Sequence, residues 1–256
     1  MKNYLKSKVN ENFFKWSTEG YGGIVGGNKQ ARFWFCGIEW GKDDNFNKIP
    51  IVKDTNNYPK GFSSEDKNKK WFGSMDNIYG PISKIIVSTL EELNQLPKNE
   101  LSYLEKARKY FKEKLFIENG DSFMMNLFPL PFAEDNDSHW RKLQNNLTGF
   151  DNKFLYRTFC RLYRFKYLKE LFTEIKKPKT IVCCGLGYLR DYIDIFGSDN
   201  ITDYKEEKLN KHTVISFIDG KSKIFITPFL SVRGIADDKS LEELGKILAE
   251  HLFKYQ

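Results

Sequence analysis

Residues 33–41 read FWFCGIEWG, and the way this stretch ends guides the interpretation of the whole chain. Its apolar beginning is typical of a strand buried on both faces, as in a parallel sheet. The run then stops at Gly37, Glu39 and Gly41. A tight turn explains this pattern, because glycine accepts unusual φ angles and Glu39 would be the first solvated side chain. A ligand site is the alternative explanation, because open α/β sheets bind ligands beyond the carboxyl ends of their strands.

The composition indicates a globular chain with a substantial core. The 256 residues are 40% hydrophobic and 16% aromatic, which suits one domain spanning residues 1–256. No apolar run approaches the roughly 18 residues of a membrane span, and the N-terminus lacks the apolar region of a signal peptide, so we expect a cytoplasmic protein. The cysteines show no paired spacing, which favours buried reduced thiols over a metal site: Cys36, Cys160, Cys183 and Cys184.

The net charge of +7 favours polyanionic partners, and its distribution is uneven. Residues 153–179 contain nine basic and two acidic residues, so this stretch alone carries as much net charge as the whole chain. Arg157, Arg161 and Arg164 are spaced i, i+4, i+7, which predicts one face of a helix. That face is either solvated or in contact with phosphates.

Apolar runs alternate with helical patterns along the chain. Buried strands are predicted at residues 32–36, 122–126, 180–184 and 223–227, with an edge strand at 213–218. Helices are predicted at residues 78–93, 101–116, 154–175, 188–196 and 240–253, the last opening with a capping box of Ser240 and Glu243. This order predicts a single α/β domain of three layers, α/β/α, around a central, mainly parallel four-stranded sheet.

Three of the four core strands end in unusual clusters: GIEWG, MNLFPLPF and TPFLSVRG. The carboxyl ends of parallel strands lie along one edge, so we expect Glu39, Asn126 and residues 228–234 to face one cleft. Asn126 is either an ordinary turn residue or a reader of a nucleobase, because an amide offers donors and an acceptor in one plane.

The ordered set of motifs resembles the uracil-DNA glycosylase superfamily. The order is strand–GxEWG, strand–NxxPLxF, strand–GLG–helix and strand–TPxxSxRG, and it covers roughly residues 30–250. The segment NLFPLPF at residues 126–132 looks most like the single-strand-selective monofunctional type. The resemblance implies that fold and an activity that cleaves the N-glycosidic bond of a flipped base.

The resemblance assigns roles to the first two motifs. It puts Glu39 at the catalytic, water-handling position, where the family has Asp or Asn, and Asn126 at the base-reading position. Phe62 resembles the aromatic residue that stacks on the flipped base. Gly37 and Trp40 would line the base pocket, with Trp40 replacing the usual proline. Gly41 stands where some members place a bulky Tyr, so a larger, 5-substituted base could enter.

The last motif departs from the family. Phe229 occupies the place of the usual catalytic His, so another residue must donate to the leaving base. Arg233 is the candidate for this catalytic role. Phe229 would then border the base. By the same resemblance Leu230, Ser231 and Val232 would contact DNA. The arginine set Arg157, Arg161 and Arg164 would contact DNA if its face binds phosphates and is not simply solvated.

The resulting expectation is a DNA glycosylase that releases a flipped, 5-modified pyrimidine, in repair or in defence against phage with modified DNA. The carboxylate suits an oxocarbenium-like transition state. We expect DNA as the partner, a monomer, and no cofactor, metal or membrane. The alternatives are a catalytically silent nucleic-acid-binding protein on the same fold and an α/β protein that binds a nucleotide or another small molecule.

Weaker signals have simpler explanations. GLGYLR at residues 185–190 lacks the third glycine of a dinucleotide fingerprint and indicates a strand–helix turn. His139 lies among acids without a second histidine at ligand spacing, so we interpret it as part of a polar loop. Asp43, Asp44 and Glu134 are alternative carboxylates should Glu39 not be the catalytic one.

Overall fold

The computed structural model describes residues 1–39, 41, 46–52, 58–68, 75, 77–97, 100–132, 140–174, 179–198 and 204–254. The strands are β1 (Ile24–Gly27), β2 (Phe33–Gly37), β3 (Ser122–Asn126), β4 (Thr180–Cys184), β5 (Lys205–Leu209), β6 (His212–Asp219) and β7 (Ser222–Thr227). The helices are α1 (Lys2–Lys8), α2 (Glu11–Thr18), α3 (Ser64–Lys67), α4 (Tyr79–Glu92), α5 (Tyr103–Glu113), α6 (Lys142–Thr148), α7 (Lys153–Phe159), η2 (Cys160–Arg164), α8 (Phe165–Thr173), η3 (Leu186–Tyr188), α9 (Leu189–Phe196) and α10 (Asp238–Phe253).

The chain forms two compact units. Unit 1 comprises residues 1–25, 37–59 and 125–175, and it holds α1, α2 and α6 to α8. Unit 2 comprises residues 26–36, 60–124 and 176–256, with most of the strands and the remaining helices. The expectation of one domain over residues 1–256 stays a prediction.

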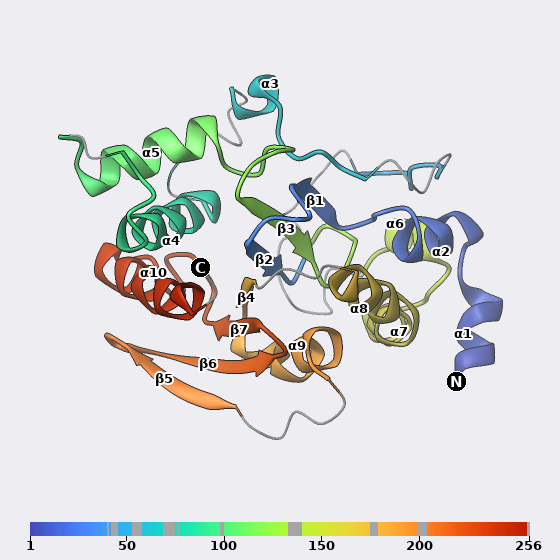
Figure 1. Cartoon of the computed structure of the whole chain (residues 1–256). Coiled ribbons are helices and arrows are strands. Elements are labelled where there is room, and N and C mark those ends of the chain that lie inside the picture. The colour runs from blue at the N-terminus through green and yellow to red at the C-terminus, as the bar shows by residue number, and fades with distance from the viewer. Residues whose placement is uncertain are drawn as a thin grey trace. The chain divides into compact units, whose positions relative to one another are not determined.

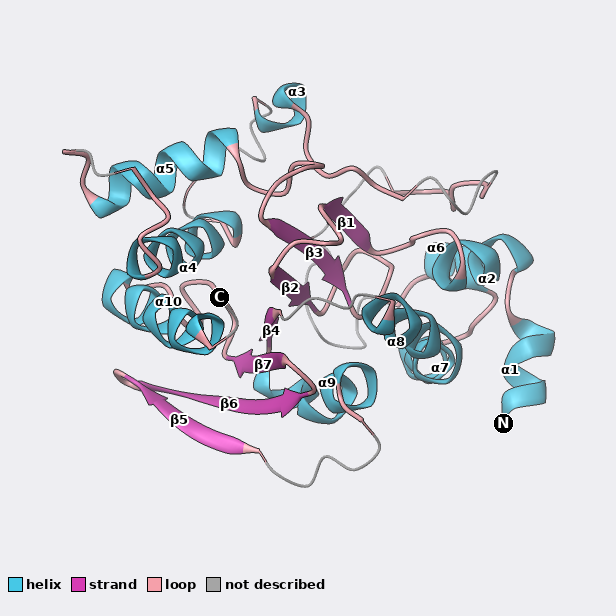
Figure 2. Ribbon diagram, in the orientation of Figure 1, coloured by secondary structure: helices cyan, strands magenta, loops and turns pink. Residues whose placement is uncertain are grey.

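An α/β architecture is confirmed, but the expected four-stranded, mainly parallel sheet is wrong. Within the described residues the sheet has seven strands, in the order β1-β3-β2-β4-β7-β6-β5 (Figure 2). β4 pairs in parallel with β2 and with β7, whereas β6 pairs antiparallel with β5 and with β7. The sheet is therefore mixed. β6 is also not the expected edge strand, because β5 continues the sheet beyond it.

The predicted core runs all form strands, and their buried faces explain why. Every residue of β2, β3 and β4 is buried, as continuous apolar runs require. All four cysteines are free and buried, as expected: Cys36, Cys183 and Cys184 lie in these strands, and Cys160 lies in η2. Within the described part of the chain, no helix has both the length and the apolarity to cross a membrane.

Helices α4, α5 and α10 gather on one side of the strands of unit 2 (Figure 1). α4 and α10 approach closely at Gly245, where an added Cβ would lie 2.5 Å from the Ser88 Cβ. The Thr89 hydroxyl donates to the Gly245 carbonyl at 3.0 Å across the same contact. Because Gly245 has no side chain, the backbone of α10 can pack directly against the Ser88 side chain of α4.

Helix α10 begins earlier than the sequence predicts. Its cap is Asp237, not Ser240, and the Asp237 carboxylate accepts from the Ser240 backbone N–H at 3.0 Å and from the Ser240 hydroxyl at 2.8 Å. The expected capping box of Ser240 and Glu243 is therefore wrong, because Asp237 fits the cap position better. Burial raises the pKa of Asp237, but the Ser240 hydrogen bonds and the Lys211 charge outweigh it and hold the pKa at about 2.

Replacing Asp237 with Ala should lower the free energy of unfolding at pH 7 by about 1 kcal/mol, because the α10 cap is lost. Asp237→Asn keeps a capping oxygen and should lose less. The folded-state pKa lies below the ordinary value of 3.8, so the carboxylate stabilises the fold above that pH and this contribution disappears as the pH falls toward 2. Urea unfolding of the three proteins across pH 2–7 measures this, and an Asn variant that keeps the same pH dependence would contradict it.

Candidate functional site

The chain segments leaving β2 and β3 run side by side in unit 1. The Leu127 backbone N–H donates to the Gly37 carbonyl at 2.9 Å, and the Phe128 N–H donates to the Ile38 carbonyl at 2.8 Å. Glu39, just after β2, and Asn126, the last residue of β3, therefore lie at the same end of two neighbouring strands. This is the arrangement that the strand-end argument predicts for these two residues.

The Glu39 carboxylate forms a buried ion pair with two cations from α7. Lys153 Nζ lies 3.1 Å from Oε2, and Arg157 Nη2 lies 3.0 Å from Oε1. The exposed fraction of the side chain is 6% for Glu39, 0% for Lys153 and 15% for Arg157. Burial makes the geometry of this trio costly to disturb, because a charge left without its partner has little water to solvate it.

Aromatic rings surround the two cations. Lys153 Nζ lies 4.0 Å from the centroid of the Phe132 ring, and the Arg157 guanidinium lies 5.1 Å from that of Phe128. Such rings attract a cation through their electron-rich faces and exclude water from it. Burial raises the pKa of the Glu39 carboxyl above its ordinary value, although Lys153 and Arg157 oppose the rise through charge and hydrogen bonds.

Asn126 is 2% exposed and is held against the turn before β1. Its backbone N–H donates to the Gly23 carbonyl at 2.9 Å, and its side-chain amide approaches the same oxygen at 3.4 Å. Gly23 has a φ of +77°, and an added Cβ there would lie 2.8 Å from the Arg164 guanidinium. Position 23 therefore requires glycine. The turn at this position fixes the backbone of Asn126.

Arg164 is a buried structural residue. Its guanidinium donates to three backbone carbonyls, those of Leu127 at 2.7 Å, Ser17 at 2.8 Å and Asn126 at 2.9 Å. The side chain is fully buried. It satisfies the carbonyls of the segment that leaves β3 and ties that segment to the end of α2. A planar group with five donors suits this task better than an ammonium does.

The expectation that Arg157, Arg161 and Arg164 share one face is wrong for Arg164. The guanidiniums of Arg157 and Arg161 both lie over the Phe128 ring, at 5.1 and 5.8 Å from its centroid, and Arg161 is exposed. Arg157 lies in α7, whereas Arg161 and Arg164 both lie in η2, a π-helical segment. The wider π turn changes the direction of later side chains, so i, i+4, i+7 spacing no longer defines one face.

Phe62 and the loop after β7 belong to unit 2. Phe62 is half-buried, with its ring centroid 5.3 Å from that of Tyr79 and 6.2 Å from that of Phe116. The loop after β7 turns tightly, because the Ile235 N–H donates to the Phe229 carbonyl at 2.7 Å. The loop exposes three of its side chains and buries one: Phe229, Val232 and Arg233 are exposed and Leu230 is buried, while Ser231 is partly exposed.

Several candidates lie outside the described residues: Trp40, Asp43, Asp44, Glu134 and His139. Gly41 is described, and an added Cβ there would meet no described atom within 4 Å. Among the residues that the structure describes, no group of three His, Cys, Asp or Glu side chains could hold a metal ion.

Lys153 is the site residue that sequence reasoning missed. It appears in the charge count of residues 153–179, but no local pattern distinguishes it from its basic neighbours. Its partner Glu39 lies 114 residues away in the sequence. Tyr156 was missed as well: its oxygen accepts from the Leu130 N–H at 3.0 Å and so holds the segment that follows Asn126.

A comparison with models of known protein families and with curated proteins finds no match. The resemblance to uracil-DNA glycosylases therefore depends on the ordered motifs of this chain, and its functional content is a proposal.

Replacing Arg164 with Lys should lower the free energy of unfolding by about 2–4 kcal/mol, because one ammonium cannot reach three carbonyls and leaves buried acceptors unsatisfied. Arg161→Lys is the matched control: the same change at an exposed position of the same helix should stay within about 0.5 kcal/mol. Urea unfolding measures both. An equal decrease in the free energy of unfolding for the two variants would show that the three hydrogen bonds of the buried Arg164 guanidinium do not stabilise the fold.

Replacing Glu39 with Gln should lower the free energy of unfolding by about 3–5 kcal/mol, because the buried Lys153 ammonium loses its negative partner. Adding Lys153→Met removes that buried charge while keeping an apolar stem, so the double variant should recover at least half of the loss. A double variant that is less stable than Glu39→Gln alone would mean that the two side chains are not energetically coupled.

Proposed function

We propose that this chain is a DNA glycosylase that hydrolyses the N-glycosidic bond of a flipped pyrimidine, one that can carry a 5-substituent. The observation that carries the proposal is the pair formed by Glu39 and Asn126, which leave adjacent strands at one end of the sheet. A carboxylate and a planar amide are the two groups that this reaction needs near the sugar and the base edge. The finer expectation of a uracil-DNA-glycosylase-like fold is part of the same proposal.

Glu39 would orient the attacking water and stabilise positive charge on the sugar. A carboxylate has about four lone-pair sites, and the contacts to Lys153 and Arg157 occupy one on each oxygen. The remaining sites can accept hydrogen bonds from water. Fixing both oxygens beforehand favours catalysis, because a preorganised group needs no reorganisation when charge develops.

One of the cations beside Glu39 can take the role of the missing histidine, which is to stabilise the leaving base. The departing base takes the bonding electron pair, so negative charge develops on it as the sugar becomes positive. Arg157 is partly exposed and lies in the same unit as Asn126. It therefore joins Arg233 as a candidate donor to the leaving base, in place of the histidine whose position Phe229 occupies.

A Cβ built at Gly41 meets none of the described atoms within 4 Å, which supports a substrate larger than uracil. A side chain at this position would be expected to exclude bases with a bulky 5-substituent. DNA would be bound with help from exposed basic residues such as Arg161, and from the loop that carries Phe229, Val232 and Arg233.

The test is incubation with single- and double-stranded oligonucleotides that contain uracil or 5-substituted pyrimidines, with mass spectrometry of released base. Glu39→Gln/Lys153→Met should lower the single-turnover rate on the order of a hundredfold or more while binding DNA like the wild type, because the carboxylate acts mainly in the transition state. Asn126→Ala should lower both rate and discrimination between bases. Lys153→Met alone is the control that changes the trio but keeps the carboxylate.

A catalytically silent nucleic-acid-binding protein is the second candidate. Both oxygens of Glu39 already accept hydrogen bonds from cations, which would suit a purely structural carboxylate. In that case no oligonucleotide would yield free base, and the variants would change stability or affinity alone. If base is released at full rate by the double variant, the catalytic carboxylate lies elsewhere.

A further inference from the structure

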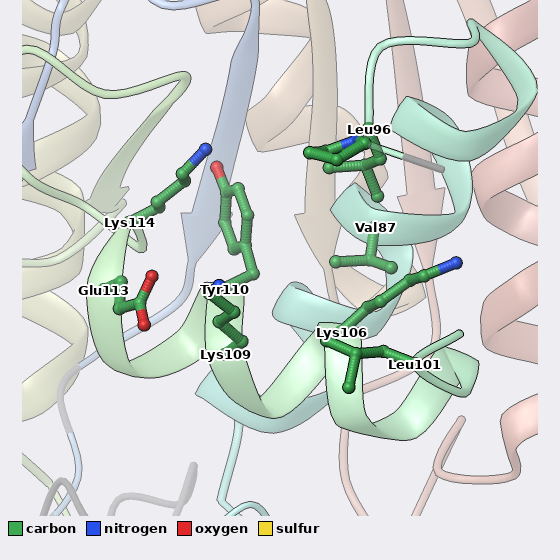
Figure 3. Close-up of a pocket in the computed structure, with 9 residues that line it drawn as sticks. Val87, Leu96, Leu101, Lys106, Lys109, Tyr110, Glu113 and Lys114 are labelled. Atoms are coloured by element: carbon green, nitrogen blue, oxygen red, sulfur yellow. The ribbon is translucent and has the colours of Figure 1, made fainter. Parts of the chain in front are cut away.

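Unit 2 contains a cavity of about 170 Å³ between α4, the segment that follows it and α5. Its apolar lining comes from Val87 on α4 and from Leu96, Pro97 and Leu101 in the connecting segment, with Tyr110 on α5. Figure 3 shows Val87 and Leu96 opposite the side chains that project from α5. These residues all belong to one unit, and none of them is used in the proposed glycosylase site.

Three lysines line the same cavity: Lys106 and Lys109 on α5, and Lys114 directly after α5. Lys106 is neutralised, because its Nζ lies 2.7 Å from a Glu91 oxygen. Lys109 and Lys114 are exposed, and within the described part of the chain neither forms an ion pair. Their alkyl stems can border the apolar lining while their ammonium groups remain at the mouth.

Among the described residues that line the cavity, Glu113 is the one acid, and it cancels only part of this charge. Lys67 on α3 is close enough that the charge of Glu113 raises the pKa of Lys67, although burial lowers that pKa to about 8. Lys106 is already paired with Glu91, and Glu113 offsets one of the two remaining lysine charges, so the described lining keeps one excess positive charge. The excess positive charge at the mouth belongs to Lys109 and Lys114.

We propose that this cavity binds a small organic anion with an apolar body, such as a single aromatic ring or a short acyl chain that ends in a carboxylate. An apolar cavity of about 150 Å³ accommodates a benzene-sized ligand, so the volume here suits one ring. The apolar part would lie against Val87, Leu96 and Leu101, and the carboxylate would lie between Lys109 and Lys114. This site is independent of the proposed glycosylase activity.

The test uses sodium phenylacetate as the probe and benzyl alcohol as its uncharged counterpart, with titrations followed by the methyl resonances of Val87, Leu96 and Leu101. The carboxylate should bind with a dissociation constant on the order of 1 mM, as expected for a ligand of this size. Benzyl alcohol should bind at least about tenfold more weakly, because it has no charge to meet the lysines.

Two variants and one control complete the experiment. Lys109→Met/Lys114→Met keeps the apolar stems and should weaken phenylacetate binding about tenfold, whereas Lys112→Met, an exposed change on the same helix outside the lining, should not. Leu101→Trp fills the mouth and should abolish binding of both probes. Equal affinity for the acid and the alcohol, an unchanged Lys109→Met/Lys114→Met variant, or shifts confined to other residues would overturn the proposal.

Discussion

The buried Glu39 carboxylate, with Lys153 and Arg157 at 3.1 and 3.0 Å, is the constraint on which the strand-end region depends. Three charged side chains are removed from water together, so each requires the others. The trio fixes the segment that leaves β2 against α7. Further along the same helical run, Arg164 fixes the segment that leaves β3. One run of helix thus holds both strand exits through buried cations.

This constraint changes how the charge of the chain is understood. Residues 153–179 looked like a basic surface, but Lys153 and Arg164 are buried and Arg157 is largely so. Much of the excess positive charge therefore serves the interior, where it satisfies a carboxylate and backbone carbonyls. The exposed Arg161 is what remains of the predicted arginine face for a polyanionic partner. A positive net charge alone is accordingly a poor measure of DNA-binding surface in this protein.

The sequence predicts the core strands well, because continuous apolar runs have few alternatives. Runs at residues 122–126 and 180–184 form β3 and β4 with the same bounds. β1 and β5 were missed because IVGG and KEEKL have the glycines and charges that strands generally avoid, and pairing with neighbours overrides that preference. The common place of Asn126 and Glu39 at one end of the sheet was predicted from their positions at strand ends. Lys153 was not, because its role depends on a partner distant in sequence, and the buried place of Arg164 depends on a π segment that residue spacing cannot reveal.

The central claim is that Glu39 is a buried carboxylate whose charge is maintained by Lys153 and Arg157. The most direct measurement is a pH titration of its side-chain carboxyl carbon by ¹³C NMR in the wild type and in Lys153→Met. The account predicts a wild-type midpoint above the ordinary 4.5, because burial favours the neutral form, and a higher midpoint in the variant, because one stabilising cation is lost. A wild-type midpoint at or below 4.5 that does not move in Lys153→Met would contradict it.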